Sequence, residues 1–261
     1  MTATDDLGHV VEVVRPARRV VSLVPSLTEA VAATRPELLV GATDWCTHPA
    51  DLDVARVRGT KNPDRAAIEA LQPDVVLVNR EENRELDVRR LRAAGIAVWV
   101  TVIETVDEAL TSMRRMFTEG LGWDEPAWLD RARMTWAEPS PGVPSTGSRT
   151  DGLRVAVPIW RDPWMVVGSR TFTGDVLGRL GLVNAFGDSD DRYPHVELAE
   201  IDHDDVDLVL LPDEPYVFTA ADGPEAFTTT PTALVSGRAL TWYGPSMLTA
   251  RAELERAIEA S

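Results

Sequence analysis

Short apolar runs alternate with amphipathic stretches along the first part of the chain. The runs have the length and β-branched composition of buried strands, and they cover residues 19–24, 38–42, 74–78 and 97–102. Between them, apolar positions recur at helical spacing before residue 36, from 63 to about 71, and from 85 to 94. Strands that alternate with helices predict a parallel, doubly wound α/β sheet. Residues 9–14 alternate weakly and are interpreted as an edge strand.

Residues with capping preferences predict where these helices begin and end. Ser26, with Glu29 three positions later, has the pattern of a capping box. Asn62 is suited to an N-cap and Pro63 to the first helical position after it. Gly95 is expected to end the helix over residues 85–94.

The alternation stops after residue 103. Thr105 and Glu108 form a second capping-box pattern, which predicts a long helix to residue 119 with Gly120 as its C-cap. Helical spacing resumes over residues 125–136, with Trp128, Leu129 and Trp136 as apolar positions. Residues 138–152 (EPSPGVPSTGSRTDG) are rich in Pro, Gly and Ser and predict a linker or exposed loop.

The strand and helix alternation then resumes. Strands are expected over residues 154–160, 206–211 and 233–236, and helices over about 174–180 and 245–260. Residues 74–81 and 207–214 share one pattern, in which an acid and four apolar residues precede a polar loop that ends in Glu. This internal sequence similarity favours two related α/β lobes. We therefore predict an N-terminal lobe over 1–103, a bridging helical segment over 104–138 and a C-terminal lobe over 139–261.

Composition and charge narrow the class of protein. The net charge of −16 argues against nucleic acid and anionic membrane surfaces as partners. No apolar run reaches the roughly 20 residues that span a bilayer, so no membrane insertion is expected. The first residues lack a basic stretch followed by an apolar one, so a soluble, cytoplasmic location is expected as the sequence stands. A trimmed signal peptide would make the location extracytoplasmic.

The loop over residues 41–49 (GATDWCTHP) follows a predicted strand and gathers unusual chemistry. It contains Asp44, the single cysteine Cys46, and His48. A metal site needs three or four convergent ligands, and only Cys46 and His48 are strong ligands close in sequence. We favour no metal site, with these two as weak candidates. A Cys46–His48 dyad would make the protein an enzyme, but alternate residues of an extended segment point to opposite faces.

Nucleotide and hydrolase motifs are missing from the sequence. It contains no G-x-x-x-x-G-K-[ST], G-x-G-x-x-G or G-x-S-x-G pattern. Tryptophans instead stand at strand ends or in loops, where they often line clefts, and these are Trp45, Trp160, Trp164 and Trp242. Basic residues fall in the same loops, namely Lys61, Arg80, Arg161 and Arg170. This placement favours a locally positive cleft for a ligand with anionic groups.

Several segments together resemble the cobalamin- and siderophore-binding proteins of ABC importers, a family of metal-chelate receptors with a helical backbone. In the first half these segments are RVVSLVPSLTE, VGATDWCTHP, GTKNPD and LQPDVVLV. In the second half they are IWRDPWMVVGSRTF, YPHVELAEI, LVLLPDEPY and LTWYGPS. They span most of the chain in the order of the family.

The resemblance implies two α/β lobes joined by a single long helix, with a ligand in the cleft between the lobes and no catalysed reaction. No intrinsic cofactor is implied, and cobalamin or a ferric chelate would be the transported ligand. The positions that match the ligand contacts of the family are Pro25, Ser26, Trp45, Thr60, Lys61, Asn79, Arg80, Trp160, Arg161, Trp164, Trp242 and Tyr243. Thr60 and Asn79 stand where cobalamin-binding members can have tryptophan.

The resemblance also implies a permease partner. Members of the family present one surface Glu per lobe to the importer. The first-lobe position is Ala66 here, with Glu69 nearby, and Glu197 or Glu200 could serve in the second lobe. Two alternative functions remain open. One is a cytosolic relative that binds another anionic small molecule without an importer, and the other is an enzyme that depends on Cys46 and His48.

Overall fold

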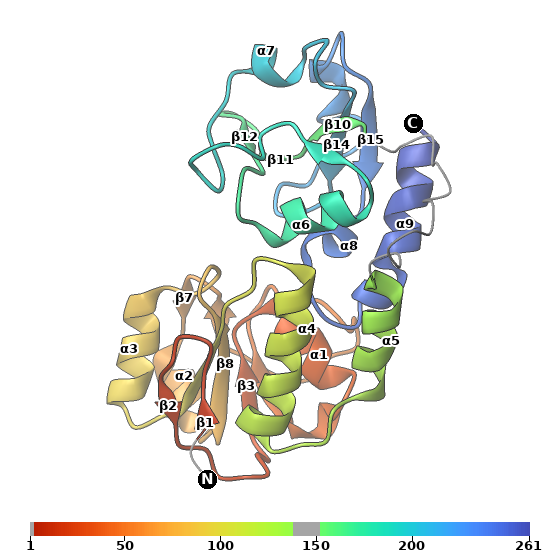
Figure 1. Ribbon diagram of the computed structural model, residues 1–261. Helices are drawn as coiled ribbons and strands as arrows, with labels where there is room; N and C mark the ends of the chain where they lie inside the picture. The colour runs from red at the N-terminus through yellow and green to blue at the C-terminus, as the bar shows by residue number, and fades with distance from the viewer. Residues whose placement is uncertain (1–2, 138–151) are drawn as a thin grey trace. The chain divides into compact units, whose positions relative to one another are not determined.

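The computed structural model describes residues 3–137 and 152–261, and the predicted linker over 138–152 lies almost entirely outside this part of the chain. The described residues form two compact units (Figure 1). Unit 1 comprises residues 1–103, 107–132 and 243–245, and unit 2 comprises 104–106, 133–242 and 246–261. The predicted bridging segment 104–138 is thus divided between the two units.

Unit 1 is built on a five-stranded parallel sheet. Its strands, in spatial order, are β5 (Ala55–Arg56), β4 (Leu39–Ala42), β3 (Val20–Ser22), β8 (Val75–Asn79) and β9 (Val98–Thr101). The helices of the alternating part are α1 (Pro25–Ala32), α2 (Arg65–Ala70) and α3 (Glu85–Ala93). The predicted parallel α/β class is therefore confirmed for this unit.

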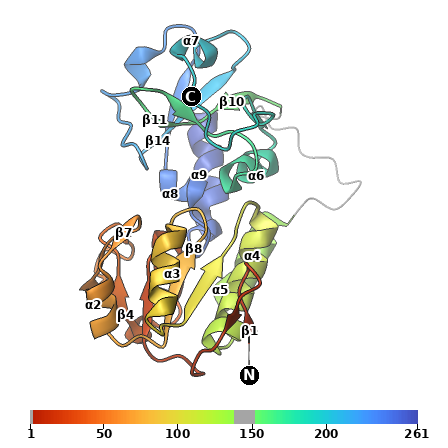
Figure 2. The same cartoon turned by 90° about the vertical axis from the view of Figure 1, so that its left-hand side faces the viewer.

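The two faces of this sheet are covered by different helices. Val76 and Val78 of β8 pack with Ile68 of α2 and Leu91 of α3. Figure 1 and Figure 2 both show α2 beside α3. Side chains of a strand alternate between faces, so Leu77 points to the opposite side, where α1 lies and where the sheet is also fully buried. Strands buried on both faces explain the continuous apolar runs in the sequence.

Two helix starts differ from their predictions. Helix α1 begins at Pro25 with Val24 as N-cap, and no side chain caps it, so Ser26 is not the N-cap. The fixed φ of proline is compatible with the first helical position, which places the start one residue earlier than the polar pattern does. Asp64 caps α2 by accepting from the Ala67 N–H at 3.1 Å. The predicted cap residue Asn62 instead belongs to a short strand.

The segment after β9 contains two helical stretches, as the sequence predicts. Helix α4 (Val106–Arg115) continues as a π-helical turn, η2 (Met116–Leu121), which ends at Gly122 with a φ of 68°. The predicted C-cap Gly120 lies inside this turn, where a side chain would meet the Trp99 ring at 3.0 Å. Helix α5 (Ala127–Trp136) follows, and its predicted apolar residues are buried. The left-handed conformation of Gly122 explains the interruption.

Unit 2 repeats the plan with a four-stranded parallel sheet. Its strands, in spatial order, are β13 (Val183–Asn184), β10 (Arg154–Ala156), β14 (Leu208–Pro212) and β15 (Thr232–Val235). Its helices are α6 (Phe172–Arg179), α7 (Leu198–Ile201), α8 (Gly237–Thr241) and α9 (Met247–Glu259). One face of the sheet packs Val209 and Leu211 against Ile201 and Phe218.

The internal similarity between residues 74–81 and 207–214 has a structural counterpart in each unit. The Asp74 carboxylate accepts from the Arg19 N–H at 2.9 Å, and the Arg19 side chain donates to the Leu71 carbonyl. In unit 2 the Asp207 carboxylate accepts from the Arg154 N–H at 2.7 Å, and the Arg154 side chain donates to the Asp205 carbonyl. An aspartate at the same position of the shared pattern therefore aligns the central strand with its neighbour in each unit.

Three two-stranded antiparallel pairs complete the described structure. One joins β1 (Ala3–Thr4) to β2 (Val10–Val11), where the edge strand was predicted. The others join β6 (Arg58–Gly59) to β7 (Asn62–Pro63) and β11 (Pro158–Trp160) to β12 (Met165–Val166). Single 3-10 turns cover η1 (Pro36–Leu38) and η3 (Pro224–Ala226). The β6–β7 and β11–β12 hairpins carry residues of the candidate site.

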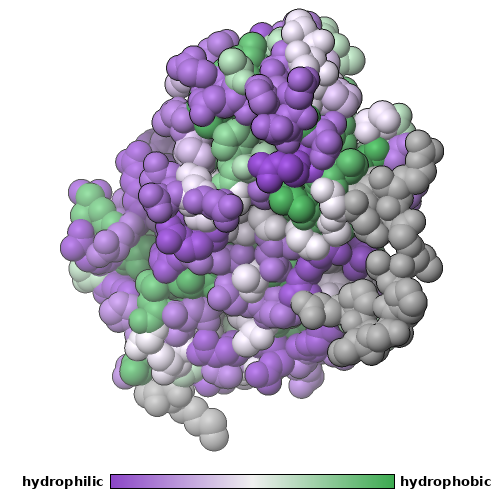
Figure 3. All heavy atoms as spheres, turned by 45° about the horizontal axis from the view of Figure 1, so that its top comes forward, coloured by the Kyte–Doolittle hydropathy of each residue, from purple (hydrophilic) through white to green (hydrophobic). Residues whose placement is uncertain are grey.

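Hydrophilic residues cover much of the face shown in Figure 3, with smaller apolar areas between them. Within residues 3–137 and 152–261, no helix is both long and apolar enough to cross a membrane.

Candidate ligand-binding site

The predicted contacts of unit 1 lie on loops that leave the carboxyl ends of its parallel strands. The segments that follow β3, β4, β5 and β8 contain Pro25, Ser26, Trp45, Thr60, Lys61 and Arg80, of which Pro25 and Ser26 form the start of α1. Open α/β sheets bind ligands at this edge. The fold therefore places residues from distant parts of the sequence on one side of the unit.

Trp45 is the most exposed large aromatic side chain of this edge, with 67% of its surface accessible. Its loop is fastened to the β6–β7 hairpin by the Asp44 N–H, which donates to the Arg58 carbonyl at 2.9 Å. The indole lies against Gly59, where an added Cβ would be 3.3 Å from Trp45 Nε1. An aromatic side chain that is exposed yet supported by a glycine is suited to contact a ligand.

Asn83 joins three of these loops, although the sequence analysis did not single it out. Its Oδ1 accepts from the Asn79 N–H at 2.9 Å, and its Nδ2 donates to the carbonyls of Leu23 at 3.2 Å and Thr60 at 3.0 Å. The side chain is buried. Asn83 therefore positions the ends of β3 and β8 and the β6–β7 hairpin relative to one another.

The remaining polar candidate residues of unit 1 differ in how accessible their side chains are to a ligand. The buried Asn79 side chain accepts from the Glu81 N–H at 2.8 Å and donates to Thr101 Oγ1 at 3.2 Å, so its amide shapes the loop. Lys61 Nζ donates to the Glu81 carbonyl at 2.6 Å and remains exposed. Thr60 is half-buried and Arg80 is exposed.

Tyr243 belongs to unit 1, where it is buried next to α1. Its hydroxyl donates to Glu82 Oε1 at 3.3 Å. Burial, followed by the charge of Glu82, raises the pKa of Tyr243 well above its ordinary value of 10.0, while the Ser26 hydroxyl acts in the opposite direction. Ser26 is also buried, and the neighbouring Pro25 is half-buried. These residues form the floor of the edge rather than its surface.

In unit 2 the β11–β12 hairpin follows β10 and presents Trp160. Trp160 is 47% exposed, and its ring meets that of Tyr216 edge to face at 5.6 Å between centroids. Trp164 is buried instead, stacked on Phe218 at 6.1 Å and in contact with Phe227 at 5.5 Å. The hairpin therefore separates the two predicted contacts, with Trp160 at the surface and Trp164 in the core.

Arg161 does not form the positive site that the sequence predicts. Its guanidinium binds the carboxylates of both Asp222 and Glu225, and it lies over the Trp164 ring at 5.6 Å. The hydrogen bond to Glu225 is the main reason that the pKa of Arg161 is raised. A cation held by two carboxylates contributes no net positive charge. Arg161 therefore does not supply the attraction for anionic groups that the sequence predicts at this position.

Trp242 is also buried, at 7% exposure. The Arg238 guanidinium lies 5.8 Å from the centre of its ring. A hydrogen bond from Trp242 favours the charged form of Glu214, but burial outweighs it and raises the pKa of Glu214 above its ordinary value. Trp242 therefore packs inside the protein.

Cys46 and His48 of the loop over residues 41–49 do not form a reactive pair. Cys46 is fully buried, and its Sγ lies 3.0 Å from Thr28 Oγ1 and 3.1 Å from Thr43 Oγ1. Burial raises the pKa of the Cys46 thiol above 9.0, which disfavours the nucleophilic thiolate. His48 Nδ1 lies 3.1 Å from Thr47 Oγ1. Within the part of the chain that the structure describes, no three His, Cys, Asp or Glu side chains gather to hold a metal ion.

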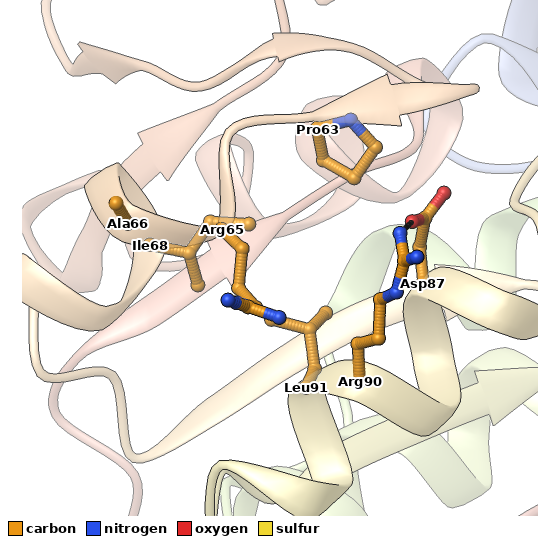
Figure 4. A pocket seen from close by; sticks show the side chains of 7 residues that line it. All are labelled: Pro63, Arg65, Ala66, Ile68, Asp87, Arg90 and Leu91. Atoms are coloured by element: carbon orange, nitrogen blue, oxygen red, sulfur yellow. Dashed lines mark ion pairs between the residues drawn. The ribbon is translucent and has the colours of Figure 1, made fainter.

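The predicted docking acids have different local roles. Glu69 is exposed on α2, where it pairs with Arg65 at 3.1 Å. Glu200 accepts from the Glu197 N–H at 2.7 Å at the start of α7, and Glu197 is exposed. A pocket of about 370 Å³ lies between α2 and α3. Figure 4 shows its lining residues, Pro63, Arg65, Ala66, Ile68, Asp87, Arg90 and Leu91.

The architecture is shared with solved structures of periplasmic binding proteins. The chain superposes on the periplasmic heme-binding protein RhuT from Roseiflexus sp. RS-1 with a TM-score of 0.76 and 18% identity, covering 94% of this chain and 98% of that one. A periplasmic heme-binding protein from Pseudomonas aeruginosa gives 0.74 and 20%, with 94% of each chain covered. The periplasmic vitamin B12-binding protein BtuF of Vibrio cholerae gives 0.71 and 18%, with 94% and 98% covered. The chain has the two-lobed fold of solute-binding proteins.

Curated proteins with similar sequences give a second comparison. The chain is 26% identical over 188 residues to the vitamin B12-binding protein of Pectobacterium carotovorum subsp. carotovorum, which covers 70% of this chain and 67% of that protein. It is 21% identical to the vitamin B12-binding protein of Vibrio parahaemolyticus, with 71% and 67% covered. No family model matches the chain. These relatives confirm the resemblance seen in the sequence, and they are binding proteins, which supports the prediction that the chain is not an enzyme.

Proposed function

We propose that this chain is a solute-binding protein that holds a flat metal chelate, such as a corrinoid, at the carboxyl edges of its sheets, in the interlobe cleft that the family resemblance implies. One observation carries the proposal. Each unit supports an exposed tryptophan on a loop or hairpin at that edge, Trp45 in unit 1 and Trp160 in unit 2. Large flat rings gain much of their binding free energy by stacking on such side chains.

The surrounding residues supply the supporting contacts of the proposed site. Thr60, Lys61 and Arg80 offer polar groups at the same edge of unit 1 as Trp45, and Tyr216 extends the aromatic surface around Trp160. Asn79, Trp164, Trp242, Tyr243 and Ser26 would act by holding the loops in place. The curated relatives are named for vitamin B12 and several structural neighbours for heme, which supports a metal chelate as the ligand class.

We propose an extracytoplasmic location and an ABC-importer permease as the partner. The structural neighbours are named periplasmic proteins, and this supports the location. The exposed carboxylates of Glu69 and Glu197 are the proposed permease contacts, one in each unit. Replacing both by Arg should abolish importer-dependent uptake while chelate affinity stays unchanged. Normal uptake by that variant would remove the two carboxylates from the proposal.

Tryptophan fluorescence tests the ligand class. We expect quenching on titration with at least one of cyanocobalamin, ferric protoporphyrin and a ferric siderophore. Trp45→Phe and Trp160→Phe should each weaken the affinity for that chelate, measured by calorimetry. Trp128→Phe changes the same residue type in the core of unit 1 and should leave the affinity intact. A protein that gives neither quenching nor heat with any of the three chelates would contradict the proposal.

A further inference from the structure

A ring contact and a set of hydrogen bonds link the exposed Trp160 to two carboxylates. Trp160 meets the Tyr216 ring at 5.6 Å, and the Tyr216 hydroxyl donates to Asp222 Oδ2 at 2.8 Å. The other oxygen of Asp222 accepts from the Arg161 guanidinium, which also binds Glu225. Asp222 therefore connects the aromatic surface to the only cation of the network.

The guanidinium of Arg161 is occupied on several sides. One nitrogen, Nη1, donates to both Asp222 and Glu225, and the Trp164 ring lies 5.6 Å away. A third carboxylate, Asp162, lies 3.7 Å from Nε. Only 21% of the Arg161 side chain is exposed, whereas the carboxylates are 44% to 86% exposed. A ligand that approaches Trp160 therefore meets more negative than positive charge.

The corresponding edge of unit 1 does not reverse this balance. Lys61 and Arg80 are exposed, but the carboxylates of Glu81 and Glu82, which directly follow Arg80, balance their two charges. The whole chain carries a net charge of −16. Long-range attraction for a polyanion is therefore lacking as well.

We propose that Asp222 and Glu225 are specificity-determining residues, which neutralise Arg161 and so select uncharged or cationic chelates over chelates that carry carboxylates. This inference rests on the proposed function and names the charge class of its ligand. The selection works by repulsion as well as by fit, because like charges next to a partly desolvated surface weaken binding of the wrong ligand. The carboxylates themselves need not touch the ligand.

Two corrins that share a ring and differ in charge test the proposal by calorimetry. Dicyanocobinamide carries amide side chains, and dicyanocobyrinic acid carries carboxylates on the same ring. The wild-type protein should bind the amide corrin at least about tenfold more tightly. In Asp222→Asn/Glu225→Gln, the released Arg161 should tighten binding of the carboxylate corrin about tenfold, while affinity for the amide corrin changes less than about threefold.

A matched control separates local from global charge. Glu255→Gln/Glu259→Gln on α9 makes the same change in net charge and should leave the preference as in the wild type. The preference should also shrink when NaCl is raised from about 0.05 M to about 0.5 M. Glu225→Gln alone, at a half-exposed carboxylate, should give a smaller shift and covers the case in which the double variant does not fold.

The outcomes distinguish the inference from the proposed function. A folded double variant and a folded Glu225→Gln variant that both keep the wild-type preference would overturn the inference, as would a wild-type protein that prefers the carboxylate corrin. If neither corrin nor ferric protoporphyrin binds to any variant, the proposed function itself fails. If the preference shifts equally in the control on α9, the effect is global and the roles of Asp222 and Glu225 are rejected.

Discussion

Single polar side chains organise the proposed binding loops. Asn83 bonds to backbone groups of three separate segments of the proposed site, whereas Asp202 in unit 2 accepts from the consecutive N–H groups of Thr228, Thr229 and Thr230 in the segment before β15. Buried backbone groups that lose such partners cost free energy because water cannot replace them. Asn83 therefore acts on ligand binding through the shape of the loops, and Asp202 acts on the stability of unit 2.

Replacing Asn83 by Ala should lower the free energy of unfolding by about 2 kcal/mol, because it leaves the buried Asn79 N–H and two carbonyls without a partner. Urea unfolding followed by circular dichroism measures this. Glu85→Gln, at a solvent-exposed ion pair of α3, is the control and should change stability by less than about 0.5 kcal/mol. A loss for Asn83→Ala no larger than that of the control would show that Asn83 does not fasten the loops.

The lowered pKa of Asp202 predicts that the stability of the protein depends on pH. Burial acts to raise its pKa, but hydrogen bonds from Thr230, Thr228 and Thr229 outweigh this and lower the pKa from 3.8 to about 2. Because the pKa is lower in the folded state, the ionised Asp202 carboxylate stabilises the folded state above pH 3.8. This contribution is lost as the pH falls towards 2. Asp202→Asn should cost about 1 kcal/mol at pH 7, after allowance for solvent screening.

The comparison of Asp202→Asn with the wild type should be made by urea unfolding at several pH values. The stability difference should shrink as the pH falls below 3.8. A difference that stays constant with pH would mean that the charge of Asp202 does not carry the effect.

At the scale of elements, two short hairpins present the exposed tryptophans. The β6–β7 hairpin supports Trp45 through Gly59, and the β11–β12 hairpin carries Trp160. Both hairpins follow strands of the parallel sheets, but they are antiparallel themselves. They extend the carboxyl edges beyond the loops that the doubly wound pattern alone provides.

Gly59→Ala should weaken chelate affinity by about tenfold, because the new methyl group would lie 2.5 Å from Asn62 Oδ1 and 3.3 Å from Trp45 Nε1 and so displace the indole. Calorimetry measures the affinity. Gly178→Ala is the matched control, since nothing lies within 4 Å of its added Cβ in α6. It should stabilise the protein by about 0.5 kcal/mol and leave affinity unchanged. Equal affinities for the two variants would contradict the proposed role of the hairpin.

The sequence predicts the inner parallel strands β3, β8, β9 and β14 well because each is an apolar run buried on both faces, whereas the short and exposed edge strands β5 and β13 were not predicted. The hairpins were missed because strands as short as β6 and β7 have no alternation to recognise. The neutralisation of Arg161 was missed for another reason, since its partners Asp222 and Glu225 lie 61 and 64 residues away. Trp164 and Trp160 share one short segment, so only the folded hairpin separates the core residue from the surface residue.

At the scale of the whole molecule, two parallel α/β units of the same plan each contribute one exposed tryptophan to the proposed site. The paired use of Asp74 and Asp207 shows how similar the two plans are. Trp45 and Trp160 would then contact one ligand from separate units, and neither unit would bind a chelate tightly alone. This is the central claim of the proposed function.

Calorimetric titration of the chelate that quenches fluorescence, on the wild type, Trp45→Ala, Trp160→Ala and the double variant, tests this claim most directly. We predict one chelate per chain, a loss of affinity of about tenfold or more for each single variant, and no measurable binding for the double variant. Wild-type affinity in either folded single variant, or two independent chelates per chain, would contradict a single ligand held by both units.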